Sequence, residues 1–155
     1  MTKAIVPPAH PYMDPAAEPE PSTPNDYLRE LYTRIVDAKS GFDVMVEKAE
    51  PEFRDVATSF RDMHGRHASK IAELLHGHVD KDGSLMGTVN KAVVSIRAFF
   101  DEIDEDIMDQ VRNGEQWVLE SFREAEANCA GPHEAQLIAM RAELEDLLDR
   151  TAHLD

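Results

Sequence analysis

The chain is poor in cysteine and has no long hydrophobic run. Cys129 is the single cysteine among 155 residues, so no intramolecular disulfide can form and nothing points to an oxidising compartment. No segment approaches the roughly 20 apolar residues that cross a bilayer, and the residues after Met1 lack the apolar stretch of a secretory signal. We therefore expect a cytoplasmic protein without membrane insertion, in which Cys129 packs on an apolar helix face.

Positive charge is also scarce. The chain has 16 Lys and Arg residues and 31 Asp and Glu residues, which gives a net charge of -15. Such a surface repels phosphate groups, so we expect no nucleic-acid partner. The chain also lacks a Rossmann fingerprint, a phosphate-binding loop, a Cys-x-x-Cys pair and a nucleophile elbow. These absences favour a protein that is not an enzyme, and we assign no catalytic residue.

Proline is concentrated at one end. Seven of the nine prolines lie within the first 24 residues. Proline has no amide hydrogen and disfavours helix in the residue before it, so we predict a disordered tail over residues 1–24 and one folded domain over 25–155. The tail is either an inert extension or a docking arm for another protein.

Apolar residues after the tail recur at steps of three and four, which predicts amphipathic helices at about 26–49, 51–78, 104–129 and 132–153. Asn25 or Asp26 can cap the first helix, and Pro51 and Gly131-Pro132 mark tight turns. Between helices two and three lies a crossover of about 25 residues with its own short helix. The predicted fold is all-α, a ferritin-like four-helix bundle with a short crossover helix.

Three stretches resemble a known family. They are Asp37–Phe42, Phe60–Leu74 and, most distinctively, Arg112–Phe122. The chain is similar there to a group of uncharacterised bacterial proteins with a ferritin-like four-helix bundle and no assigned activity. The resemblance covers about residues 26–154. It implies the fold, and it implies no particular chemistry, because members of the group are not uniformly known to bind metal.

A di-iron site of the ferritin-like type needs four inward carboxylates, including two Glu-x-x-His pairs. The literal match, Glu73-Leu-Leu-His76, fails because Leu74 lies in the apolar stripe and the pair turns to the far side of the helix. In the first helix Glu30 and Asp37 point away from the stripe. The last helix has Glu143 and Glu145 at the margins of its stripe and no Glu-x-x-His. The pattern therefore predicts that the four-carboxylate site is absent.

A smaller set of polar residues is still predicted to face the core. His64 and His67 rotate to near the core direction, and Glu115 flanks the inner face of the third helix. Two histidines at i and i+3 can share one ion, so His64, His67 and Glu115 form a candidate site for iron or zinc. The alternative is a hydrogen-bonded polar layer in which Glu115 or Arg141 satisfies the imidazoles.

Two functions follow from these alternatives. The first is a non-catalytic ferritin-like bundle, an interaction or stress-associated protein with a degenerate metal site and no cofactor. The second is a metal-binding bundle that stores or oxidises iron, or holds zinc. Trp117, Val36 and Val44 point away from the stripe, which predicts a second packing surface for the crossover helix or for a homodimer. At Gly65 we expect close packing by a neighbouring side chain, because glycine weakens a helix.

Overall fold

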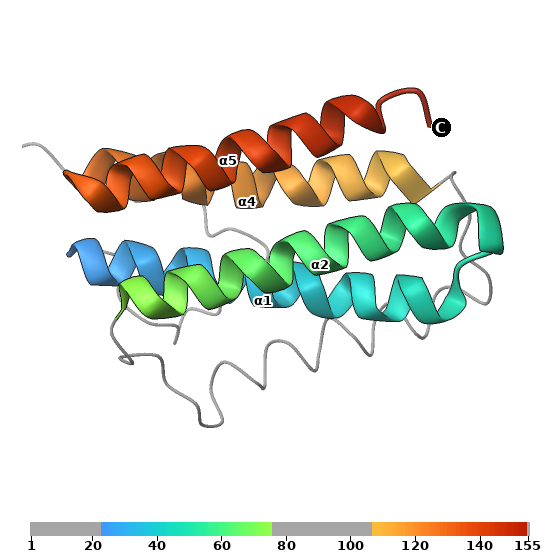
Figure 1. Cartoon of the computed structure of the whole chain (residues 1–155), viewed down its shortest axis with the longest axis horizontal. Coiled ribbons are helices and arrows are strands. Elements are labelled where there is room, and N and C mark those ends of the chain that lie inside the picture. The colour runs from blue at the N-terminus through green and yellow to red at the C-terminus, as the bar shows by residue number, and fades with distance from the viewer. Residues whose placement is uncertain (1–22, 76–106, 155) are drawn as a thin grey trace, which may run out of the picture.

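The computed structural model describes residues 23–75 and 107–154. These residues form four helices: α1 (Pro24–Lys48), α2 (Pro51–Leu74), α4 (Met108–Asn128) and α5 (Pro132–Arg150). No strand occurs within these two ranges. The all-α four-helix bundle is therefore confirmed (Figure 1). The tail was predicted over residues 1–24, and its residues 1–22 lie outside the described residues. The crossover with its short helix and the two predicted helix ends at 76–78 and 104–106 also lie outside them.

The first helix begins earlier than the sequence analysis placed it. Thr23 is the N-cap: its Oγ1 accepts a hydrogen bond from the Asp26 amide, and its own amide donates to the Asp26 carboxylate, both at 3.2 Å. The prediction of Asn25 or Asp26 as the cap was wrong. Pro24 fits the first helical position, where no amide hydrogen is needed, so the helix extends through it to Thr23.

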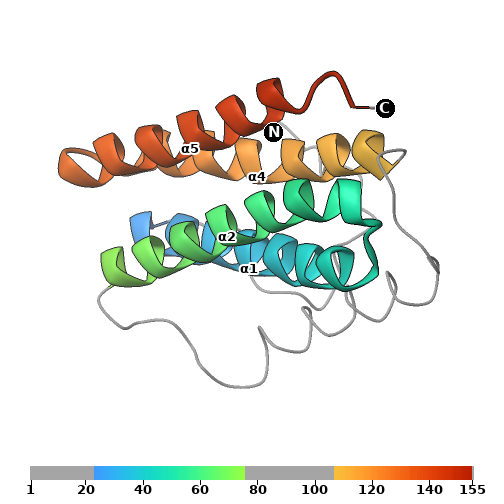
Figure 2. The same ribbon diagram turned by 45° about the vertical axis from the view of Figure 1, so that its right-hand side comes forward.

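Short connections set the direction of the helices within each pair. Because α2 begins three residues after α1 ends, and α5 four residues after α4 ends, α1 runs antiparallel to α2 and α4 antiparallel to α5 (Figure 1). Phe42 stacks on Phe60 in the first pair, and Arg141 binds Glu126 in the second. Figures 1 and 2 show that α2 ends at the opposite end of the bundle from the start of α4. Helices α2 and α4 thus run in the same direction. They are diagonal to each other, because the neighbouring pairs are α1–α2, α1–α4, α4–α5 and, much more loosely, α2–α5.

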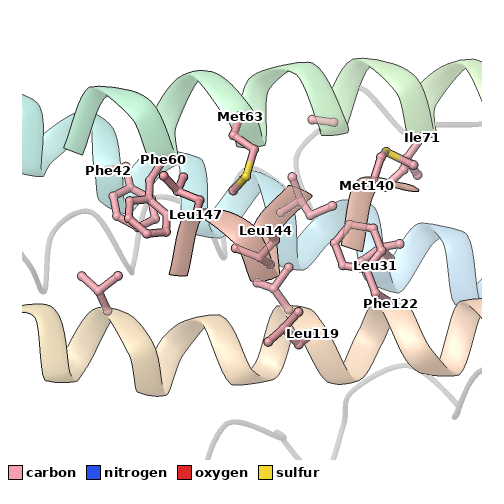
Figure 3. Close-up of a cluster of buried hydrophobic side chains, with 14 of the residues drawn as sticks. Leu31, Phe42, Phe60, Met63, Ile71, Leu119, Phe122, Met140, Leu144 and Leu147 are labelled. Carbon is pink, nitrogen blue, oxygen red and sulfur yellow. The ribbon is translucent and has the colours of Figure 1, made fainter. Parts of the chain in front are cut away.

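One continuous apolar core fills the space between the helices. Figure 3 shows the rings of Phe42 and Phe60 lying together beside Leu147, with Met63 and Leu144 next along the core. Its largest fully buried side chains come from all four helices and include Leu28, Leu31, Ile35, Phe60, Met63, Ile71, Phe122, Leu137 and Leu144. At about 1.5–3 kcal/mol for each buried side chain of this size, hydrophobic burial is the main force that assembles the bundle.

The residues predicted to lie on outer faces of the helices differ in their exposure to solvent. Trp117 is 39% exposed, as its helical position predicts. Val44 is only 2% exposed although it lies outside the main core cluster, and Val36 is partly buried against that cluster. None of the four described helices is apolar enough over a sufficient length to span a membrane.

Candidate functional site: a buried histidine–carboxylate layer

A histidine and a glutamate meet inside the bundle. His64 on α2 and Glu115 on α4 are 0% and 2% exposed, and His64 Nε2 lies 2.8 Å from Glu115 Oε1. Each residue occupies the apolar stripe of its helix near mid-length, so the helical period turns both side chains inward. An ionised carboxylate can only accept, so the imidazole Nε2–H donates in this pair.

A second pair lies one helical turn along α2. His67 is 2% exposed, and its Nε2 lies 3.2 Å from Glu143 Oε2 on α5. The other oxygen of Glu143 is 2.6 Å from an Arg66 guanidinium nitrogen. The Glu143 side chain is 38% exposed, so this pair reaches the bundle surface whereas His64–Glu115 does not. Glu143 therefore links the interior to the seam between α2 and α5.

Aromatic rings hold the two imidazoles. Phe42 stacks on His64 with ring centroids 5.6 Å apart, and Phe122 meets His67 edge-on at 5.9 Å. The two imidazoles lie perpendicular to each other at 6.4 Å. An apolar ring therefore lies against each imidazole. Next to such surfaces a buried charge without a partner is costly.

The directions of the pKa shifts of His67 and Glu143 indicate that the His67 imidazole is neutral. Burial lowers the pKa of His67, and the hydrogen bond to Glu143 only partly opposes this effect. For Glu143, burial acts to raise the pKa, but the hydrogen bonds from Arg66 and His67 outweigh it and the pKa is lowered. A neutral imidazole donating to an ionised carboxylate is the state consistent with both directions.

The layer leaves three buried polar atoms without a hydrogen-bond partner. They are His64 Nδ1, His67 Nδ1 and Glu115 Oε2. With each Nε2 donating, each Nδ1 is a bare acceptor, and the free carboxylate oxygen is an acceptor too. Each of these acceptors would be satisfied by a hydrogen-bond donor or by a cation of its own.

The predicted candidate site is thus brought together only in part. His64 and Glu115 pair directly, whereas His67 pairs with Glu143. Among residues 23–75 and 107–154, no group of three or more His, Cys, Asp and Glu side chains is placed to hold a metal ion. Metal binding by His64, His67 and Glu115, and the choice between iron and zinc, stay predictions.

Of the two partners expected for the imidazoles, Glu115 is confirmed for His64, whereas Arg141 is not a hydrogen-bond partner of either ring. Its guanidinium binds Glu126 at 2.7 and 3.0 Å and Glu145 at 2.7 Å, which ties α5 to α4 at the surface. The partner that the sequence analysis missed is Glu143. Its place at the margin of the α5 stripe was the available signal, because a long side chain at a margin can reach inward.

Asp37 is half-buried on α1. Its Oδ1 is buried without a hydrogen-bond partner among the described residues, and burial raises its pKa from 3.8 to about 6. Two of its neighbours on the same face of α1, Gly41 and Val44, are buried. The prediction that Asp37 points away from the core stripe agrees with this position, and the face on which it lies is nevertheless shielded from water.

Cys129 caps the end of α4 and is 5% exposed, with burial raising the pKa of its thiol. This confirms the packing role expected from its place on the apolar stripe. A neighbouring side chain does lie against Gly65, as predicted: among the described residues a Cβ there would meet Lys39 Cε at 3.5 Å. That distance is ordinary van der Waals contact, so packing within the described fold does not require glycine.

Comparison with known protein families identifies the family to which the chain belongs. The profile of a family described as "Domain of unknown function (DUF2383)" matches residues 24–128, more than half of the chain. The chain therefore belongs to this family. No curated protein and no solved structure matches it. The match covers α1, α2 and α4, including His64, His67 and Glu115, and ends before α5 and Glu143.

Proposed function

We propose that this member of the DUF2383 family is a non-catalytic helical bundle that acts by binding other proteins, and that its histidine–carboxylate layer serves the structure. The observation that carries the proposal is the separation of the two pairs: His64 binds Glu115 and His67 binds Glu143. Each imidazole already has a carboxylate partner on a different helix, as a structural polar layer requires.

The reactive groups of the described residues support the same conclusion. The Cys129 thiol is buried with a raised pKa, so it is a poor nucleophile. The free Nδ1 atoms of His64 and His67 are buried, so neither can reach a substrate at the surface as a general base. A stress-associated role remains compatible with this chemistry, since it needs no catalytic group.

Metal content tests the proposal. The untagged protein is purified and its metals are measured by elemental analysis, alongside His64→Ala and His67→Ala. His153→Ala is the control, because His153 is exposed beyond the end of α5. We expect far less than one metal per chain in all four proteins. One metal per chain that is lost in both layer variants and kept in His153→Ala would overturn the structural role.

A metal-binding bundle is the second candidate, and the three unmatched acceptor atoms favour it. His64 Nδ1, His67 Nδ1 and Glu115 Oε2 are buried in one layer without partners. Imidazole nitrogens and one carboxylate suit zinc or iron, and a three-ligand set would leave an open position. Iron would permit redox chemistry and storage, whereas zinc would serve structure or hydrolysis.

Cobalt titration tests this second candidate directly. Co²⁺ occupies zinc-type sites and shows visible absorption that reports its ligands. The candidate predicts a saturable band and a rise in melting temperature, both lost in Glu115→Gln, which removes the carboxylate charge while keeping the side-chain shape. Absence of the band at millimolar Co²⁺ would exclude the His64, His67 and Glu115 set.

A further inference from the structure

The seam between α2 and α5 is the loosest contact between neighbouring helices of the bundle. A groove of about 1030 Å³ opens along it, and His67, Met140 and Glu143 are among the residues that line this groove. Neither His64 nor Glu115 lines it. The groove therefore brings solvent next to the His67–Glu143 pair, while the His64–Glu115 pair stays enclosed between α2 and α4.

One side chain makes the polar contacts that cross this seam. Glu143 Oε1 lies 2.6 Å from an Arg66 guanidinium nitrogen, and Glu143 Oε2 lies 3.2 Å from His67 Nε2. Over residues 23–75 and 107–154, every hydrogen bond and ion pair between α2 and α5 ends on Glu143. Hydrogen bonds to ionised groups are the stronger ones in proteins, so a change at this one side chain removes the polar part of the seam.

Contacts to α4 hold α5 independently of α2. Arg141 binds Glu126 at 2.7 and 3.0 Å, and Arg112 of α4 donates at 2.8 Å to the Leu154 carbonyl, just beyond the end of α5. Neither contact includes a residue of α2, so both can persist while α5 moves away from α2. The buried Leu144 side chain of α5 opposes this movement, because opening exposes apolar surface to water. The closed seam is therefore the main state, and an open seam is a minor one.

We propose that Glu143 is a latch that controls the access of solvent and small solutes to His67. While Glu143 binds Arg66 and His67 the seam is closed, and when these contacts break, α5 moves on α4 and His67 becomes accessible from the groove. His64 stays enclosed, since its partner Glu115 lies on α4 and not on α5. The Arg66 side chain is 63% exposed and that of Glu143 is 38% exposed, so salt screens their attraction and favours the open seam.

Diethylpyrocarbonate labelling of the full chain tests the latch. The reagent acylates neutral imidazole nitrogens that solvent reaches, and peptide mass spectrometry gives the labelling rate of each histidine at one fixed pH. Glu143→Gln removes the charge and keeps the side-chain shape, so it leaves no hole over His67. We expect this variant to label His67 roughly three- to tenfold faster than the wild type does, as for the loss of one charge-assisted contact. The rates at the enclosed His64 and the exposed His153 should not change.

Matched variants and salt locate the effect. Glu145→Gln removes a charge from the same helix, but Glu145 pairs within α5 and with α4, so His67 labelling should stay at the wild-type rate. Arg66→Gln breaks the ion pair and leaves the hydrogen bond between His67 and Glu143 in place, so we expect a smaller rise than in Glu143→Gln. In the wild type, raising NaCl from about 0.05 M to about 1 M should speed His67 labelling, whereas Glu143→Gln should respond little.

Three outcomes would overturn the latch: an unchanged rate at His67 in Glu143→Gln, an equal rise at His64, which would indicate opening of the whole bundle, or the same rise at His67 in Glu145→Gln. Circular dichroism checks that each variant is folded. If Glu143→Gln does not fold, an unchanged His67 rate in Arg66→Gln overturns the latch instead. None of these readouts depends on the metal content of the protein, so failure of the latch is distinguishable from failure of the structural role proposed for the polar layer.

Discussion

His64 Nε2 and Glu115 Oε1 lie 2.8 Å apart and join α2 to α4, the two helices that run in the same direction across a diagonal of the bundle. Both side chains are essentially inaccessible to water. A polar contact across a diagonal constrains the relative height of two helices that otherwise touch only through the core. We therefore expect the pair to contribute to the register of the bundle more than to its stability.

Replacing one or both members of the pair tests this relationship. His64→Leu alone should cost about 3–5 kcal/mol, because it leaves the Glu115 carboxylate buried without a counterpart. Glu115→Leu alone should cost about 1–3 kcal/mol, because it leaves the imidazole donor unpaired. The double variant should cost far less than the sum and can match the wild type. Urea unfolding followed by circular dichroism measures all four proteins. Additive losses would show that the two groups do not interact in solution.

Asp37 should make the protein less stable as pH rises. Its folded-state pKa of about 6 is above the ordinary value of 3.8 because burial disfavours the charged form. The stability from its neutral form is fully present below pH 4 and is lost as pH rises through 6. Asp37→Asn should thus gain roughly 1–2 kcal/mol at pH 8, less than full burial would give, since the side chain keeps some contact with water.

The same variant should differ little from the wild type at pH 3.5, where Asp37 is protonated in the folded state and mostly protonated in the unfolded state. Asp55→Asn, an exposed change on α2, is the control and should not reproduce the pH-dependent gain. Chemical unfolding between pH 3.5 and 8 supplies the measurement. A gain that is the same at every pH would remove desolvation of the carboxylate as the cause.

Thr23→Ala should destabilise the protein by about 1 kcal/mol, because it removes the side-chain acceptor of the α1 capping box. Thr23→Ser keeps the hydroxyl and should restore most of the loss. Thr33→Ala is a useful contrast: its hydroxyl donates to the Arg29 carbonyl in mid-helix, so its removal should be neutral or slightly stabilising. Thermal unfolding ranks the three variants, and equal stability of Thr23→Ala and wild type would argue against the cap.

Gly65→Ala and Gly114→Ala should each stabilise the protein by about 0.5–1 kcal/mol. Among residues 23–75 and 107–154, a Cβ at Gly114 meets nothing within 4 Å, and one at Gly65 meets only the Lys39 side chain at 3.5 Å. Alanine therefore gains helix propensity at both positions without a clash. Denaturant midpoints measure the effect. A loss of stability confined to Gly65→Ala would mean that Lys39 cannot move aside.

The helical periodicity of the sequence was enough to predict much of the candidate site. The spacing of His64 and His67 within the α2 stripe placed both imidazoles inside, and the α4 stripe placed Glu115 beside them. Glu143 was missed because a residue at the edge of a stripe reaches in or out according to the gap beside it. That gap depends on how far α2 and α5 stand apart, and no local pattern encodes that separation.

The choice of ion partners was equally beyond local pattern. Arg141 lies at the right height for the polar layer, yet it binds Glu126 and Glu145, because α4 is the closer neighbour of α5. The N-cap of α1 was predicted at Asn25 or Asp26 because Pro24 was assigned to the tail. Proline suits the first turn of a helix, and the N-cap is Thr23.

By itself the amino-acid sequence determined the four helices, the apolar face of each and the inward direction of His64, His67 and Glu115, because these follow from a period of 3.6 residues along one chain. Only the tertiary structure decided which carboxylate each imidazole binds, that Asp37 is shielded, and that α2 and α5 leave a groove. Those outcomes depend on distances between helices, which packing of the whole core sets.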